Sequence, residues 1–268
     1  MKLSIVTICY NAESEIEKTI LSVSKQLFKD YEYIIVDGKS NDKTMDIIER
    51  YSDKIDTIIS EPDNGIYDAM NKGIDCAKGK WTIFLNAGDY FYNDEVLLKL
   101  FAKLDIYENI DVAYGQIVKE YKDERYLAIP FPLEYIGKFM PFGHPAAFVK
   151  TEILKLKKFD VRFKIAADYN LFYNLYSEKY RFLYIDQVIS VFESENGVSN
   201  KLGFATIKET SIVNKSYKTR GYYLAILHFK ISRLLKCILG KLNPNVVARL
   251  EKSNRRRDSH LVILSSKA

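Results

Sequence analysis

The chain of 268 residues is poor in cysteine, proline and glycine. Its three cysteines (Cys9, Cys76 and Cys237) lie far apart, which excludes a disulfide-rich scaffold and a Cys-x-x-Cys zinc site and favours a reducing compartment. Only 12 glycines and 6 prolines stand against 47% hydrophobic residues, which excludes collagen-like, low-complexity and disordered chains. The composition therefore predicts a globular protein with a substantial core.

Several familiar segments are also missing. No apolar run reaches the roughly 20 residues that a membrane-spanning helix needs. Residues 1–6 are too short and too strand-like for a secretion signal. The first half contains neither GxGxxG nor GxxxxGK[ST], so no dinucleotide or P-loop phosphate cradle is expected. We expect a cytoplasmic protein that is neither exported nor membrane-spanning.

Positive charge is scarce in the first 200 residues, where 25 Lys and Arg stand against 32 Asp and Glu. Residues 201–268 reverse this balance, with 15 basic and 3 acidic residues, so the overall charge of +5 conceals two opposite regions. An acidic body with a basic tail predicts that one part carries the chemistry and the other meets a polyanion, either a lipid surface or a nucleic acid.

The first hundred residues alternate between β-rich and helical patterns. Strands are predicted at residues 3–8, 33–36, 55–59 and 81–85, and helices follow at 16–27, 45–51 and 67–77. Ser14 and Glu17 match a capping box at the start of the first helix, whose apolar stripe is Ile16, Ile20, Val23 and Leu27. This alternation predicts an α/β fold with a Rossmann-like, mostly parallel sheet and helices on both faces.

Polar side chains follow each predicted strand, and the ends of parallel strands meet at one sheet edge where ligands bind. They are Thr7, Tyr10, Asn11, Asp37, Asp42, Glu61, Asp63, Asn86 and Asp89. Each position taken alone is also explained by the needs of a turn. Without a phosphate cradle, a divalent cation held by carboxylates is the usual counter-charge for a diphosphate, and Asp89 is the best-placed ligand.

Four segments in order resemble the family 2 glycosyltransferases with a GT-A fold. They are residues 4–11 (SIVTICYN), 33–42 (YIIVDGKSND), 64–73 (NGIYDAMNKG) and 84–89 (FLNAGD). The nearest subgroup is the colanic-acid type, which acts in bacterial surface-polysaccharide assembly. The resemblance implies a GT-A-like catalytic domain at 1–200, with a nucleotide-sugar-binding half (1–92) and an acceptor half (93–200). A basic helical extension at 201–268 lies outside the resemblance.

The resemblance also implies roles for individual residues in the first half. Thr7, Tyr10 and Asp37 would hold the uracil and ribose of a UDP-sugar. The other nucleotide-sugar-binding candidates are Asn11, Asp63, Lys72, Asn86 and Gly88. Residues 86–89 occupy the place of the family's acidic metal motif, but only Asp89 keeps a carboxylate. Asp89 is the expected ligand of Mg²⁺ or Mn²⁺, although the same four residues also form an ordinary strand-exit turn.

The second half supplies the expected base. A β-hairpin is predicted from residues 111–118 and 125–129, and Asp168 precedes an apolar helical stripe. The family places its catalytic carboxylate there, so Asp168 is expected to deprotonate the acceptor hydroxyl; the alternative is a helix N-cap. His144 is a second candidate metal or phosphate ligand, or an ordinary packed histidine. Residues 193–199 resemble an acceptor-side loop, or an Asn-Gly turn.

The tail contains an amphipathic helix. Apolar residues recur at helical spacing over residues 219–242, and basic residues interrupt the run: Leu224, Leu227, Ile231, Leu234, Ile238, Leu242, Lys230, Arg233, Lys236 and Lys241. Such a helix suits the interface of an anionic membrane, which residues 219–257 would contact from the cytoplasmic side, or it packs on the body. No recognition motif favours a nucleic acid.

The sequence therefore predicts an inverting, metal-dependent glycosyltransferase that moves a sugar from UDP to a saccharide or a lipid-linked saccharide. Inversion follows from direct in-line attack with one base and no protein nucleophile. Two alternatives stay open: a nucleotidyltransferase on a similar sheet, and a membrane-associated subunit that binds the nucleotide sugar without turning it over.

Overall fold

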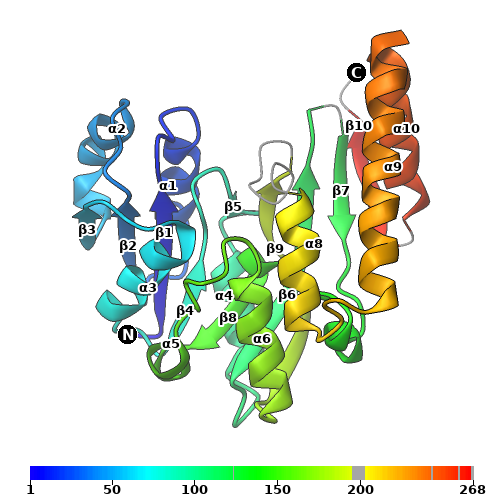
Figure 1. Ribbon diagram of the computed structural model, residues 1–268. Helices are drawn as coiled ribbons and strands as arrows, with labels where there is room; N and C mark the ends of the chain where they lie inside the picture. Colours follow the sequence, from blue (N-terminus) through cyan, green and yellow to red (C-terminus); the bar gives the residue numbers. More distant parts are fainter. Residues whose placement is uncertain (123, 195–202, 243, 259, 267–268) are drawn as a thin grey trace.

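A single sheet runs through the molecule in the computed structural model, which describes residues 1–122, 124–194, 203–242, 244–258 and 260–266 (Figure 1). The strand order is β10-β7-β6-β8-β4-β1-β2-β3, with β9 paired to β5 and β6. The strands are β1 (Leu3–Cys9), β2 (Tyr31–Asp37), β3 (Thr57–Ser60), β4 (Trp81–Phe84), β5 (Tyr90–Phe91), β6 (Val112–Glu120), β7 (Glu124–Ala128), β8 (Ala147–Lys150), β9 (Phe182–Glu193) and β10 (Leu261–Ser266).

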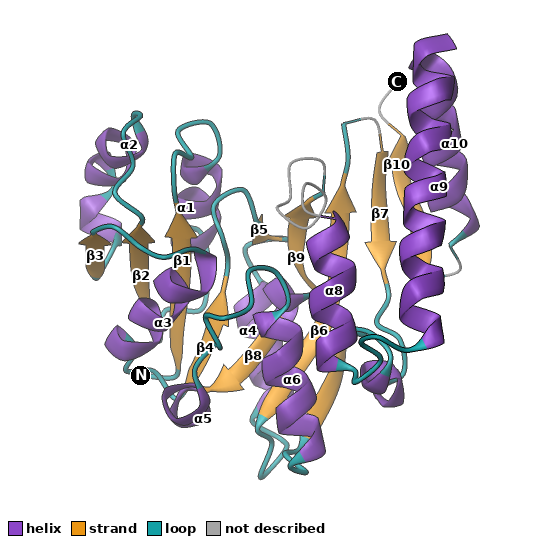
Figure 2. Cartoon of the chain, in the orientation of Figure 1, coloured by secondary structure: helices purple, strands orange, loops and turns teal. Residues whose placement is uncertain are grey.

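Helices cover both faces of this sheet (Figure 2). They are α1 (Ile16–Ser24), α2 (Thr44–Arg50), α3 (Ile66–Cys76), α4 (Val96–Leu104), α5 (Thr151–Lys157), α6 (Ala167–Ser177), α8 (Gly203–Val213), α9 (Arg220–Leu242) and α10 (Pro244–Arg257). Short 3₁₀ turns lie at Ser52–Lys54, Leu133–Gly137 and His144–Ala146. The predicted α/β fold with helices on both faces is confirmed.

Parallel pairing dominates the N-terminal half of the sheet. Strand β1 lies between β2 and β4 and is parallel to both, with Cys9 opposite Asp37. All seven residues of β1 are buried because helices cover both of its faces, so apolar residues occur on both faces, and the two polar residues, Ser4 and Thr7, are hydrogen-bonded inside the fold. Since β1, β2, β3 and β4 are parallel, their carboxyl ends meet at one edge, as the sequence predicts.

Two apolar layers flank the sheet. One joins α1 and α4 to strand residues such as Leu3 and Ile5, and the other joins α3, α5 and α6 to Val6 and Ile8. The predicted capping box of α1 is wrong: Glu15 is the N-cap residue and makes no side-chain cap. Glu17 instead accepts a hydrogen bond from the Tyr51 hydroxyl at 2.7 Å, which ties α1 to the end of α2.

Antiparallel pairing dominates the second half. Strands β6 and β7 form the predicted hairpin, and β8 pairs antiparallel with both β4 and β6. Strand β9 lies parallel to β6, and its last residues pair with β5 immediately after Asp89. The second half is thereby brought against the carboxyl ends of the first.

The C-terminal segment is not helical throughout, contrary to the prediction for residues 201–268. After α10 the chain forms β10, which pairs antiparallel with β7 and becomes the edge of the sheet (Figure 1). Glu124 of β7 is fully buried and pairs with Lys252 and Arg255 of α10 at 3.1 and 4.0 Å. The segment therefore completes the sheet as well as extending beyond it.

Candidate active site

A cavity of about 670 Å³ opens where the carboxyl ends of β1 and β4 face the amino-terminal ends of α3 and α6. Residues from the second half of the chain, in β6, β9 and the turn before β8, close its other side. Eight of the predicted site residues line this cavity: Tyr10, Asn11, Asp63, Asn86, Gly88, Asp89, His144 and Asp168. Side chains that are separated by up to 158 positions in the sequence therefore share one space.

The loop after β1 forms one wall. The Tyr10 side chain is 61% exposed, so its ring face is available to a planar ligand. Gly38 lies beside this ring, because a Cβ atom there would come within 3.3 Å of Tyr10 and 2.4 Å of the Asp63 carboxylate. Asn11 joins this loop to the next one, accepting a hydrogen bond from the backbone of Asn41 at 3.0 Å.

Asp37 lies directly beneath this wall, at the end of β2, and does not line the cavity. It is fully buried, and its two carboxylate oxygens accept hydrogen bonds from Ser40 and Ser60. These bonds shape the loop that carries Gly38 against Tyr10 and Asp63. A direct contact of Asp37 with uracil stays a prediction.

Two of the predicted nucleotide-sugar-binding residues, Thr7 and Lys72, do not line the cavity. Thr7 is fully buried within the sheet, where its hydroxyl donates to the carbonyl of Leu85 at 2.7 Å and lies 3.0 Å from the Tyr33 hydroxyl. Lys72 does not line the cavity, since its ammonium group bonds to the carbonyl of Pro62 at 2.7 Å and to Glu61 at 2.9 Å. Thr7 thus holds β1 to its neighbours, and Lys72 holds the loop that precedes Asp63.

The turn that ends in Asp89 forms the floor of the cavity. Asp89 is 4% exposed, and burial raises the pKa of its carboxyl group to about 8; the charge of Glu193 adds to this shift, and backbone hydrogen bonds oppose it. Gly88 has a φ of +99°, a conformation that side chains rarely adopt. The Oδ1 atom of Asn86 is buried and has no hydrogen-bond partner among the described residues.

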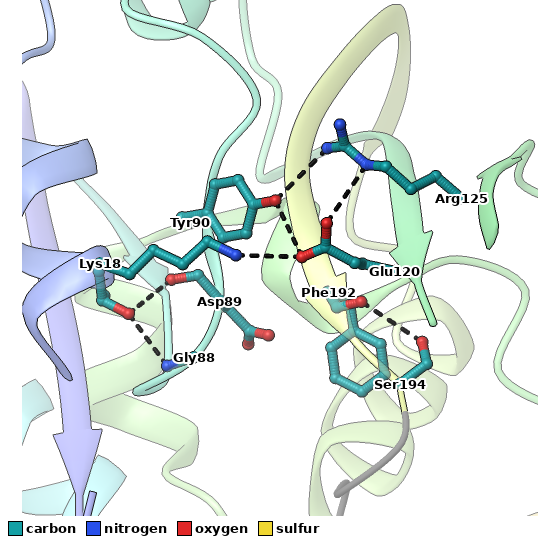
Figure 3. Close-up of polar contacts among 9 residues, drawn as sticks. Lys18, Gly88, Asp89, Tyr90, Glu120, Arg125, Phe192 and Ser194 are labelled. Carbon is teal, nitrogen blue, oxygen red and sulfur yellow. Dashed lines mark hydrogen bonds and ion pairs between the residues drawn. The ribbon is translucent and has the colours of Figure 1, made fainter. Parts of the chain in front are cut away.

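Contacts with α1 and β6 hold this turn in place (Figure 3). The Thr19 hydroxyl of α1 donates to the carbonyl of Asp89 at 2.7 Å and accepts from the amide of Gly88 at 3.0 Å. Tyr90 and Lys18 both donate to Glu120, at 3.1 and 3.0 Å, and the Lys18 ammonium also lies over the Tyr90 ring. The position of Asp89 is therefore fixed by α1 on one side and β6 on the other.

The carboxylate and amide oxygens of this turn are the donors that Mg²⁺ and Mn²⁺ prefer. Asp89, the partnerless Asn86 Oδ1 and the nearby Glu193 carboxylate meet that preference. Within the described ranges, no group of three or more His, Cys, Asp and Glu side chains has the arrangement of a complete metal site. These residues thus fit a partly open cation site that a ligand must complete.

Asp168 faces this floor from the start of α6. The N-cap residue of α6 is Ala166 and it makes no side-chain cap, so the alternative that Asp168 is an N-cap is wrong. Its Oδ1 atom lies 3.0 Å from the Tyr67 hydroxyl and accepts from its neighbouring amide at 2.8 Å. Its Oδ2 accepts no hydrogen bond within the described part of the chain. One oxygen is held, and the other is available to take a proton.

His144 lies against Asp168, with 3.9 Å between its Nδ1 and the Asp168 Oδ2. Its ring packs among Phe84, Phe159 and Phe172. Burial lowers the pKa of the imidazole, and the charge of Asp168 opposes this shift only in part. His144 is therefore neutral near pH 7, the form that accepts a proton or binds a metal.

The sequence reasoning missed several residues that line the cavity. Lys119 and Lys164 supply positive charge there, and burial lowers the pKa of Lys119. Glu15 adds another carboxylate, and Tyr67 contacts Asp168. Tyr67 stands in a segment already noted for its family resemblance, which is a usable signal. No local pattern marks Glu15, Lys119 and Lys164, because only the pairing of distant strands and loops brings them to the cavity.

Some predictions fall elsewhere. The expected acceptor-side loop includes Asn196, Gly197, Val198 and Ser199, which lie outside the described residues. Glu193, at the end of β9, lines the cavity. None of the helices in the described ranges is both long enough and apolar enough to cross a lipid bilayer.

The mostly parallel sheet flanked by helices is the GT-A type of glycosyltransferase fold. It is shared with S. aureus TarS 1–349 in complex with UDP-GlcNAc, at a TM-score of 0.64 and 21% identity over 80% of this chain and 66% of that one. It is also shared with the mannosyltransferase PcManGT from Pyrobaculum calidifontis in complex with GDP-Man and Mn²⁺, at a TM-score of 0.60 and 16% identity over 85% and 68%. The match to a longer TarS chain covers 79% of this chain but only 39% of the length of that TarS chain.

The family model of glycosyl transferase family 2 matches residues 4–159, and the chain belongs to that family. A PGL/p-HBAD biosynthesis glycosyltransferase of Mycobacterium bovis is 26% identical over 204 residues, which cover 74% of this chain and 79% of the relative. The amylovoran biosynthesis glycosyltransferase AmsB of Erwinia amylovora is 29% identical over 213 residues, covering 71% and 69%.

Proposed function

We propose that the chain transfers a sugar from a UDP-sugar to an acceptor hydroxyl with inversion, in the assembly of a bacterial polysaccharide. The colanic-acid-type resemblance and the similarity to the amylovoran enzyme support this assignment. The observation that carries it is the pairing of two carboxyl groups in one cavity. Asp89 lies in the buried turn after β4, and Asp168 lines the same cavity with an Oδ2 atom that accepts no hydrogen bond among the described residues.

The donor would bind along the loops after β1 and β4. The exposed Tyr10 ring suits a stacked uracil, with Asn11 and Asp63 around it and the buried Asp37 beneath the loop. Asn86 and Gly88 would approach the diphosphate, because the absence of a Cβ atom leaves the backbone of Gly88 accessible. The UDP-GlcNAc complex of TarS, which shares the fold, supports a uridine nucleotide as the donor carrier.

Asp89 is proposed to hold Mg²⁺ or Mn²⁺ through its carboxylate, with Asn86 as an oxygen ligand and neutral His144 as a second-rank nitrogen ligand. The Mn²⁺ complex of PcManGT supports a divalent ion in this fold. Such an ion supplies neutralisation of the charge that develops on the departing diphosphate. The cavity needs it, since its carboxylates (Glu15, Asp63, Asp89, Asp168 and Glu193) outnumber its ammonium groups (Lys119 and Lys164).

Asp168 is proposed to act as the general base. Its Oδ1 is held by Tyr67 and by the backbone, so its Oδ2 points at a defined place in the cavity. There it would accept the proton of an acceptor hydroxyl as that oxygen attacks the anomeric carbon and the bond to UDP breaks. Burial and the charge of Asp168 both raise the pKa of Tyr67, so this phenol stays protonated and keeps donating its hydrogen bond.

The test has two stages. In a thermal-shift panel of UDP, UDP-glucose, UDP-galactose and UDP-GlcNAc, at least one should raise the melting temperature, and more so with Mn²⁺. UDP release from that sugar, with water as acceptor, is then measured for the wild type and Asp168→Asn. We expect a loss of at least about 100-fold in the rate with unchanged UDP affinity. Normal turnover in Asp168→Asn would exclude the base assignment, and binding without any turnover by the wild type would favour a binding subunit.

The C-terminal helices are proposed to meet an anionic membrane from the cytoplasmic side, where a lipid-linked saccharide would be presented. The predicted apolar stripe of α9 does not pack on the body: Leu224, Leu227, Ile231, Leu234 and Ile238 are 47–61% exposed. Helix α9 contains no acidic residue, and Lys230 and Arg233 are exposed beside this stripe. A basic, apolar and uncovered face matches the chemistry of an anionic lipid surface.

Vesicle flotation tests this surface. The wild type should float with vesicles that contain phosphatidylglycerol and not with pure phosphatidylcholine vesicles. The double variant Leu227→Ser/Leu234→Ser should lose at least about tenfold in partitioning, because each leucine contributes roughly 1.5–3 kcal/mol when buried. Leu98→Ser in α4, where the leucine is similarly exposed (48%), is the matched control. Concentration-dependent dimerisation without flotation would assign the face to a second copy instead.

A further inference from the structure

A carboxylate from the C-terminal segment is bound into the loop that leads to Asp168. Glu209 of α8 accepts hydrogen bonds from three consecutive backbone amides, those of Lys164 at 2.9 and 3.0 Å, Ile165 at 2.8 Å and Ala166 at 3.0 Å. These residues immediately precede α6, and Ala166 is its N-cap. Amides at this position have no acceptor within the helix, so a carboxylate that takes all three determines the path of the chain there.

The same loop is part of the cavity. Lys164 and Ile165 line it, and the carbonyl of Ile165 accepts a hydrogen bond from Tyr67 at 2.5 Å. The Tyr67 hydroxyl is also 3.0 Å from Asp168 Oδ1. The peptide before α6 is therefore held on its amide side by Glu209 and on its carbonyl side by Tyr67, and Asp168 follows two residues after the last of these amides.

We propose that Glu209 is a positioning residue for Asp168, so that the C-terminal segment outside the matched family region completes the active site. The inference rests on the proposed role of Asp168 as the base. Glu209 acts only through the loop and does not line the cavity. Because a misplacement of about 1 Å in a reacting group costs on the order of 100-fold in rate, loss of this anchor should lower turnover without weakening donor binding.

The decisive variant is Glu209→Gln, which keeps the size of the side chain but replaces one accepting oxygen by an amino group that opposes the Lys164 amide. Glu178→Gln is the matched control, since the exposed Glu178 lies at the other end of α6 and pairs with Lys157 at 2.5 Å. The measurements are UDP release from the panel sugar that the wild type turns over fastest, UDP affinity by calorimetry, and hydrogen exchange at residues 164–166.

For Glu209→Gln we expect UDP release to fall at least about tenfold, with UDP affinity within twofold of the wild type and faster exchange at residues 164–166. Glu178→Gln should leave all three unchanged. In an Asp168→Asn background, Glu209→Gln should change the residual rate by less than twofold, because the group it positions is already inactive. Glu209→Ala should lower the rate of UDP release more than Glu209→Gln does. If Glu209→Gln fails to fold, the same measurements are made on Glu209→Asp.

Turnover of Glu209→Gln within twofold of the wild type would overturn the inference, and so would a loss of UDP affinity as large as the loss of rate. The inference would also be overturned if the fall in rate of the double variant equalled the product of the falls in Glu209→Gln and Asp168→Asn. Glu209 would then act independently of Asp168. Failure of the proposed function looks different: Asp168→Asn alone would retain normal turnover, whatever Glu209→Gln does.

Discussion

Replacement of Asp89 by asparagine should make the metal-free protein more stable, although it removes the proposed metal ligand. Burial raises the pKa of this carboxyl group from 3.8 to about 8 in the folded protein, so the folded state binds its proton more tightly than the unfolded state does. The contribution of Asp89 to stability therefore falls as the pH rises from about 4 to about 8, and is constant above that.

The size of the effect follows from this shift. Each pH unit between the two pKa values costs about 1.4 kcal/mol, so at pH 7 the carboxyl group costs on the order of 4 kcal/mol. Asparagine has nearly the same shape and no charge at any pH. In EDTA, the stability of Asp89→Asn relative to the wild type should increase by about 1.4 kcal/mol per pH unit from pH 5 to 8 and then level off.

Urea unfolding at several pH values measures this difference, and the slope is independent of how well asparagine packs. Asp94→Asn, which changes an exposed carboxylate, should show no such slope. Mn²⁺ should stabilise the wild type and leave Asp89→Asn unchanged, because a bound ion requires the deprotonated carboxylate. A difference between Asp89→Asn and the wild type that does not change with pH would refute the reasoning.

Three further predictions concern other parts of the molecule. Tyr10→Ala should weaken UDP binding about tenfold, and Tyr10→Phe should not, because stacking needs only the ring; calorimetry measures both. Glu124→Gln should destabilise the fold by roughly 3 kcal/mol in urea unfolding, since it removes the buried negative charge that faces Lys252 and Arg255, whereas the exposed Glu108→Gln should have little effect. His144→Gln should raise the Mn²⁺ concentration that supports half-maximal UDP release about tenfold, the equivalent of one lost ligand interaction of about 1.4 kcal/mol; an unchanged requirement would remove His144 from the ligand set.

Local patterns in the sequence predicted much of the fold. The mostly apolar runs at residues 3–8 and 33–36 indicated two strands of a parallel sheet, and the structure confirms them as parts of β1 and β2. The sheet edge that collects Tyr10, Asn86 and Asp89 followed from the parallel order of the strands. The predicted capping box at Ser14 does not form, because the Glu17 carboxylate accepts a hydrogen bond from Tyr51 at the end of α2 instead. The side chains of a local motif can also form hydrogen bonds with groups from distant parts of the chain, and these groups come near only in the tertiary structure.

What the sequence determined by itself was the alternation of strands and helices, because periodicity and turn chemistry are local properties. The tertiary structure alone decided which polar groups face the cavity and which are consumed within the protein. Thr7 and Asp89 both belong to strand ends, yet the Thr7 hydroxyl is taken up inside the sheet while Asp89 lies on the cavity floor. Strand β10 and the contact of Glu209 with the loop before α6 were equally invisible, since each depends on residues that approach only after the chain has folded.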